Sequence, residues 1–288
     1  MILGNYYLSL EKQGEEGEGR VFRNIDEVEM AYMNHQITFH TRIALRVDSM
    51  PKKYVFPIEH MNDYIITTYG KIIFNTIMSK GFPYINEPSN DNLTKATPEY
   101  FFAKPGQDIK QFIKDLDAKR VYIPKAGEKK DANYTGVTTP IKKKFLQEII
   151  SETFRRHRTN ETSKMLDRMK NLGFHYSTIS GITISAFDIE VYESKYEIIE
   201  SAKKRVDEIN DACEMGLLTE KERYQQVTEK IWPEATNTIS AQLIDDLRKN
   251  HADNHTFMMF DSGARGKAEN YSQLTGMGGL KSDTKGNA

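Results

Sequence analysis

A glycine-rich turn near the C-terminus carries the residues best suited to binding an anion. Residues 258–266 read MMFDSGARG, an apolar run that includes Met259 and ends in small residues around one arginine. Gly263 and Gly266 can adopt backbone angles closed to other residues and allow a ligand to approach the main chain. Arg265 is a permanently charged planar fork that suits phosphate or carboxylate. These residues predict an anion site built from backbone N–H groups and the arginine, with a solvated surface turn as the alternative.

A second candidate site is an acidic cluster at the expected tip of a helical hairpin. Glu214, Glu220 and Glu222 flank the apolar pair Leu217 and Leu218. Leucines on an exposed turn beside charges of one sign favour a docking surface for a protein with a basic face. The alternative is a solvated end of a coiled coil, the more common role of a charge cluster.

The rest of the sequence offers little catalytic chemistry. His251 and His255 have the spacing of two metal ligands on a helix, but no third ligand accompanies them, so we expect no metal site. No Walker loop, GxSxG motif or cysteine–histidine nucleophile pair occurs. The carboxylates form no recognisable catalytic pair, so we expect no catalytic residue.

The composition is that of a soluble globular chain. Its 288 residues allow one or two domains, and a formal net charge of −1 argues against a free-standing nucleic-acid binder. The single cysteine, Cys213, excludes a disulfide framework and fits a reducing compartment. No apolar run is long enough to cross a membrane and the N-terminus lacks signal-peptide features, so we expect a cytoplasmic protein.

The elements that must position these residues divide into a mixed α+β domain, residues 1–190, and a helical domain, residues 191–288. In the α+β domain the patterns predict helices at 24–33, 70–78, 142–158 and 161–172, the last capped by Gly173, and strands at 37–47, 64–68 and 182–185. Residues 86–140 are rich in polar residues, Pro and Gly, which predicts a peripheral insert with a short helix at 107–116 and a loop at 125–139.

In the helical domain, a pair of apolar stripes predicts an antiparallel helical hairpin. The first stripe consists of Ile198, Ala202, Val206, Ile209 and Cys213, and the second of Tyr224, Val227, Ile231, Ala235, Ile239, Leu243 and Leu247. Gly216 ends the first helix, and the pattern from Thr219 to Glu222 is that of a capping box opening the second. Pro233 should kink or split the second helix near Trp232.

Several motifs resemble the largest catalytic subunit of bacterial RNA polymerase, the β′ subunit. The run at 258–266 and the sequence QLTGMGGL at 273–280 are similar to the family signature MMxDSGARG…QLxGMRGL. Further landmarks occur in the family's order at residues 3–8, 17–19, 67–75, 82–86, 173–178, 181–183 and 216–224. Residues 161–169 and the long segment after Asn86 resemble the version found in low-GC Gram-positive bacteria.

This resemblance implies an internal segment of that subunit, with a pore region at about 1–190 and a funnel at about 191–288. Both regions border the secondary channel, through which nucleoside triphosphates enter. By resemblance, Arg265, with Met259, Gly263 and Gly266 beside it, would lie at the triphosphate, and Gre-type cleavage factors would dock at the hairpin tip. Phe260 and Gly278 depart from the family, which usually has a small residue and an arginine there.

The resemblance also implies what this chain needs from outside. The family's catalytic Mg²⁺ is held by three aspartates of an NADFDGD loop, which does not occur in this sequence. No cofactor is therefore expected here, and nucleotidyl transfer would require the β subunit, the remainder of β′, and DNA and RNA held by the assembled complex. Two other functions stay open: a coiled-coil adaptor that only binds proteins, and an independent phosphate-binding enzyme.

Overall fold

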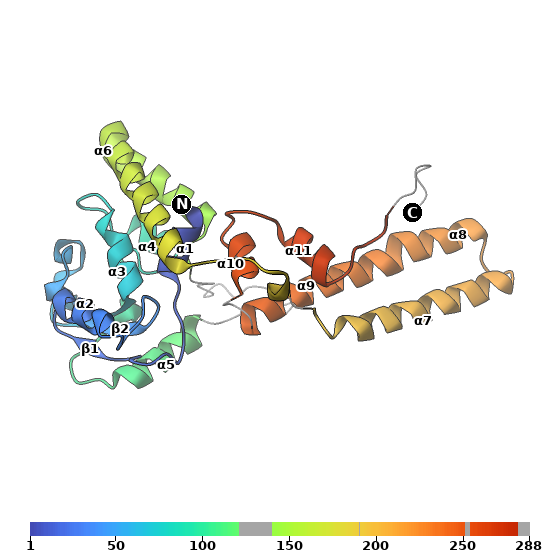
Figure 1. Ribbon diagram of the computed structural model, residues 1–288, viewed down its shortest axis with the longest axis horizontal. Helices are drawn as coiled ribbons and strands as arrows, with labels where there is room; N and C mark the ends of the chain where they lie inside the picture. Colours follow the sequence, from blue (N-terminus) through green and yellow to red (C-terminus); the bar gives the residue numbers. More distant parts are fainter. Residues whose placement is uncertain (121–139, 190, 251–253, 282–288) are drawn as a thin grey trace. The chain divides into compact units, whose positions relative to one another are not determined.

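The computed structural model describes residues 1–120, 140–189, 191–250 and 254–281, and the chain divides into two compact units. Unit 1 comprises Met1–Gly181 and unit 2 comprises Ile182–Ala288. Unit 1 combines a small sheet with helices, whereas unit 2 is helical (Figure 1), so the expected α+β class is confirmed. The predicted loop at 125–139 and His251 lie outside the described residues.

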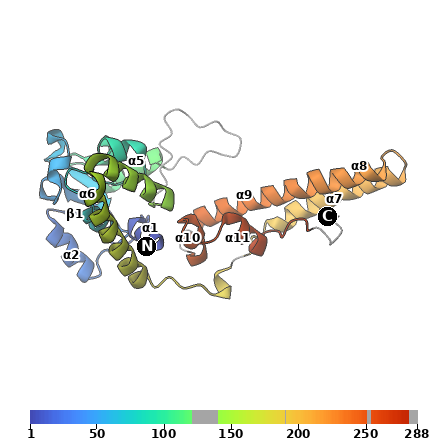
Figure 2. The same ribbon diagram turned by 90° about the horizontal axis from the view of Figure 1, so that it is seen from above.

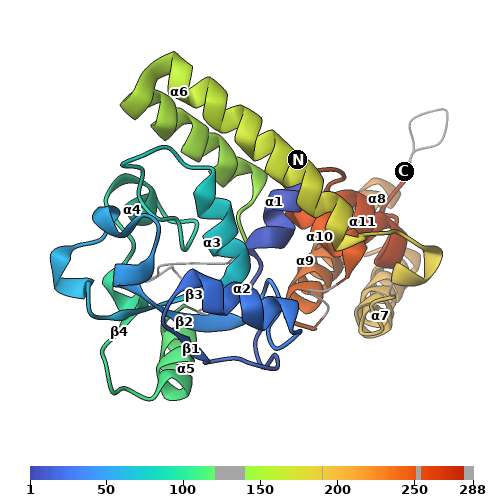
Figure 3. The ribbon, with the colours of Figure 1, turned by 60° about the vertical axis from the view of Figure 1, so that its left-hand side comes forward.

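A four-stranded sheet forms the centre of unit 1 (Figure 3). Its order is β1 (Val21–Phe22), β2 (Arg42–Arg46), β3 (Tyr64–Thr68) and β4 (Phe102–Ala103). The first pair is parallel and the other two are antiparallel, with Ala44 opposite Ile66 and Tyr64 opposite Ala103. The β-branched and apolar residues of β2 and β3 are buried, which accounts for strands in these segments.

The predicted strand at 37–47 is correct only for residues 42–46. Before β2, the Thr41 hydroxyl accepts a hydrogen bond from the Thr38 N–H (2.9 Å), and the Thr38 hydroxyl accepts one from the His40 N–H (3.1 Å). Threonine side chains that bond to nearby main-chain groups stabilise a turn in place of a ladder. The alternating sequence pattern therefore extends beyond the strand that forms.

Helices surround this sheet. They are α1 (Ile2–Ser9), α2 (Ile25–Met33), α3 (Tyr69–Thr76), α4 (Asn90–Thr94), α5 (Ile109–Arg120) and α6 (Lys143–Ser180), with short 3₁₀ helices at Val47–Ser49, Lys53–Val55, Ile58–His60 and Glu99–Phe101. Asn24 caps α2 by accepting a hydrogen bond from the Glu27 N–H, and Thr68 caps α3 in the same way from Lys71. The predicted helices at 24–33 and 70–78 are thus confirmed within two residues.

The prediction of a peripheral insert at 86–140 is wrong for residues 86–117. Leu93, Phe101 and Ala103 are buried in the core, and β4 extends the central sheet. The buried Asn92 side chain accepts hydrogen bonds from the N–H groups of Asn86 (2.8 Å) and Glu87 (3.0 Å). The polar residues of this segment therefore satisfy buried main-chain groups, and polarity alone did not indicate exposure.

Helix α6 has two arms, which lie side by side in Figure 3. Arg158 interrupts the helical backbone with φ 61° and ψ −165°, which confirms two helices in this segment. The second arm does not end at Gly173 but continues to Ser180, where Gly181 caps it at φ 60°. Gly173 lies at a close crossing with α1, where a Cβ atom would come within 2.4 Å of the Met1 carbonyl oxygen.

Unit 2 begins with an extended segment and not with the predicted strand at 182–185. The Thr183 carbonyl bonds to Nδ1 of His255 (2.9 Å), and Ser185 caps the 3₁₀ helix Ala186–Asp188. No sheet of the described residues includes this segment, so the β-branched residues have no strand partner there.

A helical hairpin follows (Figures 1 and 2), as predicted from the two stripes. It consists of α7 (Lys195–Glu214) and a continuous helical stretch of α8 (Glu220–Gln225), a π-helix (Gln226–Ile231) and α9 (Trp232–Asn250). Ala202, Ile231 and Ala235 form the buried seam, with Ile209 and Trp232 packed at its edge. The predicted interruption near Pro233 takes the form of the π-helical turns before it, because proline has no N–H to donate to the Glu229 carbonyl.

Two short helices complete the described residues of unit 2, α10 (His255–Asp261) and α11 (Ala268–Thr275). Leu243 and Leu247 of α9 form a small core with Phe257 of α10 and Tyr271 of α11. Among the described residues, no helix has the length and apolar character that a membrane crossing requires.

Candidate functional site

The glycine turn, residues 262–267, connects α10 to α11. The Asn254 side chain caps α10 by accepting hydrogen bonds from the N–H groups of Thr256 (2.9 Å) and Phe257 (3.1 Å). Gly263 and Gly266 have φ values of 75° and 82°, in the left-handed region that favours glycine. Both glycines are therefore required by the backbone path of the turn.

Main-chain hydrogen bonds close this turn on itself. The N–H of Gly263 donates to the Phe260 carbonyl (3.0 Å), and that of Arg265 donates to the Met259 carbonyl (3.2 Å). The Ala264 N–H donates to the Ser262 hydroxyl (3.3 Å). These three N–H groups are already satisfied, so the predicted anion cradle of backbone N–H groups is wrong for them.

The Arg265 side chain remains exposed and forms no ion pair with any described residue. Gly263 and Gly266 flank Arg265 in the turn, and Met259, in the preceding helix α10, contacts it through its carbonyl oxygen. That oxygen also accepts a hydrogen bond from the Ser262 hydroxyl (3.1 Å). The turn is therefore held by its own hydrogen bonds and exposes the Arg265 guanidinium to solvent. The planar guanidinium can donate two parallel hydrogen bonds to phosphate or carboxylate oxygens.

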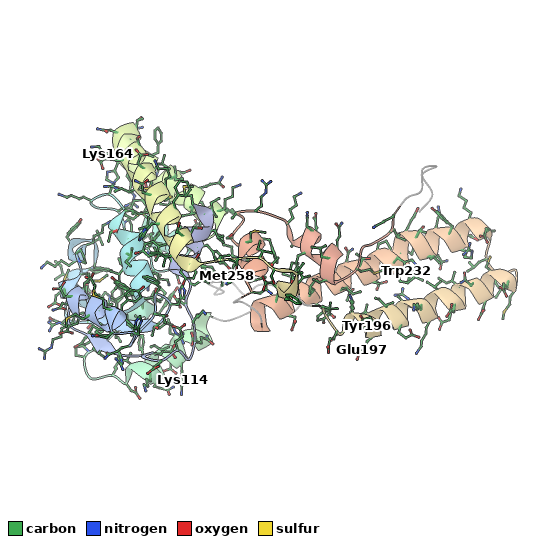
Figure 4. The ribbon with its side chains drawn as sticks, in the orientation of Figure 1. Lys114, Lys164, Tyr196, Glu197, Trp232 and Met258 are labelled. Atoms are coloured by element: carbon green, nitrogen blue, oxygen red, sulfur yellow. The ribbon has the colours of Figure 1, made fainter. Side chains whose placement is uncertain are left out.

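Aromatic packing holds the turn against the base of the hairpin, a feature that sequence reasoning missed. The Phe260 ring lies 5.2 Å from that of Phe257 and 5.5 Å from that of Tyr271, measured between centroids. Met258, labelled in Figure 4, is buried on the same helix. The aromatic residues on both sides of the turn could have indicated this packing, and the ring contacts account for the position of the Phe260 side chain.

The hairpin tip, residues 214–222, reverses the chain through two caps. Gly216 has φ 76°, and the Leu217 N–H donates to the Ala212 carbonyl (2.9 Å), which closes α7 in a left-handed cap. Thr219 and Glu222 form the predicted capping box at the start of α8. The Leu217 side chain is 75% exposed and Leu218 is half-buried, so Leu217 projects from the apex. Met215, 74% exposed, adds apolar surface that the prediction omitted.

The acidic residues of the tip have different environments. Glu220 forms an ion pair with Arg223, whose hydrogen bond lowers the pKa of the Glu220 carboxyl. Glu222 accepts hydrogen bonds from the main chain and the hydroxyl of Thr219, and these lower its pKa. Glu214 is exposed and forms no ion pair with the described residues. Among the described residues, Glu214 is therefore the one glutamate of the three that has neither a paired cation nor a role as a cap.

The two candidate sites lie at opposite ends of the hairpin, because the glycine turn packs on the end of α9 near Leu243 and the tip follows α7. They are not one composite site. Among the described residues no group of three or more His, Cys, Asp or Glu side chains could hold a metal ion. His255 instead uses its ring to bond to Thr183.

Comparison with family models matches residues 1–189 to RNA polymerase Rpb1, domain 3, and residues 218–287 to RNA polymerase Rpb1, domain 4. The chain therefore belongs to the Rpb1 family of large RNA polymerase subunits. It is 44% identical over 286 residues to the DNA-directed RNA polymerase subunit beta' of Streptococcus agalactiae serotype Ia, and equally to that of Streptococcus thermophilus. These alignments cover 99% of this chain and 22% of each relative. The chain thus spans about a fifth of their length, and the resemblance to the bacterial subunit is confirmed.

Proposed function

We propose that this chain is the segment of a β′-type subunit that borders the channel through which nucleoside triphosphates enter an RNA polymerase. Membership of the Rpb1 family, with matches at 1–189 and 218–287, supports this role. The observation that carries it is the exposed Arg265, which a closely bonded turn presents without an ion pair to any described residue. A guanidinium presented in this way suits the triphosphate of an incoming nucleotide.

In this proposal Arg265 assists phosphoryl transfer by charge and position and is neither acid, base nor nucleophile. The catalytic Mg²⁺ belongs to residues outside this chain, so the purified 288-residue chain should incorporate no nucleotide alone. The β subunit and the remainder of β′ would complete the enzyme, and DNA and RNA would bind the assembled complex. Template-dependent incorporation by the isolated chain would contradict this assignment.

The direct test places Arg265→Ala and Arg265→Lys in an assembled polymerase that contains this chain. Single-nucleotide addition is then measured across nucleotide concentrations. If Arg265 acts in the transition state, its removal should cost roughly 2.7–4 kcal/mol, by analogy with the loss of one oxyanion donor. If Arg265 stabilises the bound substrate and the transition state equally, its removal should raise KM and leave kcat unchanged. Lys267→Ala, an exposed cation at the end of the same turn, is the control. Unchanged kcat and KM in both Arg265 variants would remove the role.

We also propose that the hairpin tip docks a Gre-type cleavage factor. Leu217 and Met215 supply exposed apolar surface, and Glu214 supplies an uncompensated negative charge for a basic partner. Glu214→Lys should slow association and flatten its salt dependence, whereas Leu217→Ala should speed dissociation. Glu220→Lys is a less direct test, because it also breaks the ion pair with Arg223. Factor binding that is indifferent to both Glu214→Lys and Leu217→Ala would count against docking.

A protein-binding adaptor without polymerase function is the second candidate, and the projecting Leu217 and Met215 favour it equally. Co-purification separates the two. A tagged chain that belongs to a polymerase should recover a β-type subunit in stoichiometric amount from the cells that produce it. Recovery of other proteins without any β-type subunit would favour the adaptor. The lone Cys213 fits the reducing cytoplasm in which either complex would work.

A further inference from the structure

A cavity of about 570 Å³ opens in unit 1, which contains neither of the two candidate sites described above. Three segments line it: residues 50–54, residues 72–84 and residues 157–168 of α6. Met50, Ile72, Met78 and the buried ring of Tyr84 form apolar areas of the wall. A volume of this size falls in the range of roughly 300–1,000 Å³ that small-molecule sites occupy.

The charges around this cavity are mainly positive. Lys52, Lys80 and Arg168 line it, and the one carboxylate among its lining residues is Glu161, which pairs with Lys164 at 3.3 Å (Lys164 is labelled in Figure 4). Within the part of the chain that the structure describes, the Lys52 ammonium donates to the carbonyls of residues 78 and 79, at 2.9 and 3.4 Å, and to no carboxylate. Burial and then the charge of Arg168 lower the pKa of Lys52 to about 8. The lining cations therefore exceed the lining carboxylate by two charges, and Lys52 and Arg168 are close enough to repel each other.

Two buried polar atoms among the lining residues lack a hydrogen-bond partner in the described structure. They are the Ser79 hydroxyl and Nε2 of His157. Buried polar atoms are satisfied in the large majority of cases, so these two atoms have hydrogen-bonding capacity that a ligand or a water molecule could use. The break in α6 at Arg158, with its positive φ, directly follows His157 and allows both arms to reach the cavity. Strained backbone of this kind persists mainly where the surrounding structure requires it, often at ligand sites.

We propose that this cavity binds a small organic phosphate of nucleoside monophosphate size. Lys52 and Arg168 would hold the phosphate, with Ser79 and His157 donating hydrogen bonds, and the apolar wall would contact the ring. A phosphate monoester carries a charge of about −1.5 to −2 at neutral pH, which matches the excess of two positive charges better than a single carboxylate does. Charge-assisted hydrogen bonds of this kind are the strongest that side chains form.

The test titrates the full chain with 5′-AMP by isothermal calorimetry, alongside adenosine and inorganic phosphate. We expect one molecule of AMP to bind in unit 1, and to bind more tightly than either fragment. Arg168→Gln and Lys52→Gln should each weaken AMP binding about tenfold, the effect of losing one strong hydrogen bond. Lys170→Gln on the same helix and Lys53→Gln next to Lys52 are matched controls, since neither lines the cavity. Both should bind AMP as the original chain does.

Several outcomes would overturn the proposal. If adenosine bound as tightly as AMP, the result would contradict an anion site. If inorganic phosphate bound as tightly as AMP, the result would contradict contact between the cavity wall and the ring. Equal loss in the matched controls, or no AMP binding at millimolar concentration, would remove the site. Arg265→Ala is the variant that separates this site from the proposed polymerase role, because Arg265 lies in unit 2. AMP binding that depended on Arg265 and not on Arg168 would move the phosphate site to the glycine turn.

Discussion

The two units use their motif residues in opposite ways. In unit 1 three asparagines, Asn75, Asn86 and Asn92, point inward: they are at most 2% exposed and bond to main-chain groups of neighbouring segments. In unit 2 the side chains that distinguish the motifs point outward, with Leu217 75% exposed and Arg265 exposed. Packing therefore accounts for the three asparagines of unit 1, whereas it does not account for Leu217 and Arg265 of unit 2.

Helix α1 shows how strongly packing determines the motifs of unit 1. A Cβ atom at Gly4 would lie 1.8 Å from the Gly173 carbonyl oxygen, and one at Gly70 would lie 2.0 Å from that of Leu8. The motifs at 3–8, 67–75 and 173–178 therefore meet around α1. Their glycines permit close approach of backbones and need no ligand to explain them.

The largest effect should come from Asn75→Ala in unit 1. The Asn75 side chain donates to the Ile85 carbonyl (2.8 Å) and accepts from the Ile85 N–H (2.7 Å). Removal leaves both buried groups unsatisfied, at a cost of roughly 1–3 kcal/mol each. Urea unfolding followed by circular dichroism measures the loss. Asn237→Ala, at an exposed position of α9, should change the free energy of unfolding by less than about 0.5 kcal/mol. Equal effects of the two variants would contradict the contrast between the units.

Gly173→Ala should be the next most damaging change, and the sign of its effect on the free energy of unfolding is informative. In an open helix interior this substitution stabilises by about 1 kcal/mol, because glycine is a poor helix former. At Gly173 the new Cβ would lie within 2.8 Å of the Asn5 Nδ2 atom and closer still to the Met1 carbonyl. We therefore expect destabilisation of about 1–3 kcal/mol, as for other overpacked sites. Gly278→Ala, whose Cβ would meet only Lys281 at 4.0 Å, is the control in a melting experiment. A melting temperature that rises in the Gly173 variant would show that α1 and α6 can separate.

The sequence predicted the elements whose pattern is local. The hairpin followed from two apolar stripes, and its caps at Gly216 and Thr219 followed from residue types that have one main structural use. The residue types at 263–266 indicated a turn around Arg265, and the structure has a turn at residues 262–267 that follows Met259 of α10. Local pattern is sufficient in these cases because the period of a helical stripe and the type of a cap are set by residues only a few positions apart.

Features that depend on distant partners could not be predicted. Gly173 has the residue type of a helix cap, yet its actual role depends on Met1 and Asn5, more than 160 positions away in the chain. Residues 86–117 are polar, but their side chains bond to groups of β3 and the loop before them. The sequence also could not predict that the N–H groups of the glycine turn are hydrogen-bonded within the turn, because residue types do not reveal which main-chain donors remain free.

Ile209→Asp tests the hairpin itself and should have a smaller effect than a full core substitution. Ile209 is half-buried and packs at the edge of the seam formed by Ala202, Ile231 and Ala235. Complete burial of such a side chain contributes about 1.5–3 kcal/mol, so a half-buried one should contribute nearer the lower value. Circular dichroism should show reduced helicity, and weaker binding of a docked factor should accompany it. Glu208→Ala, the exposed neighbour, should leave both unchanged. A seam that tolerates aspartate at 209 would mean that the helices pack through other residues.

The smallest effect on stability should come from Leu217→Ala, although it removes a large apolar side chain. Leu217 is 75% exposed, so its truncation removes little buried area and should change the free energy of unfolding by less than about 0.5 kcal/mol. Leu243→Ala removes the same atoms from a site that is 2% exposed, and should cost roughly 2–5 kcal/mol. Urea unfolding of the two variants therefore measures the difference between an exposed and a buried leucine within one unit. If Leu217→Ala were as costly as Leu243→Ala, the tip would be a packed structural element, and the outward orientation of motif residues in unit 2 would not hold. If stability is unchanged while partner binding weakens, Leu217 is retained for contact, because it contributes nothing measurable to the fold.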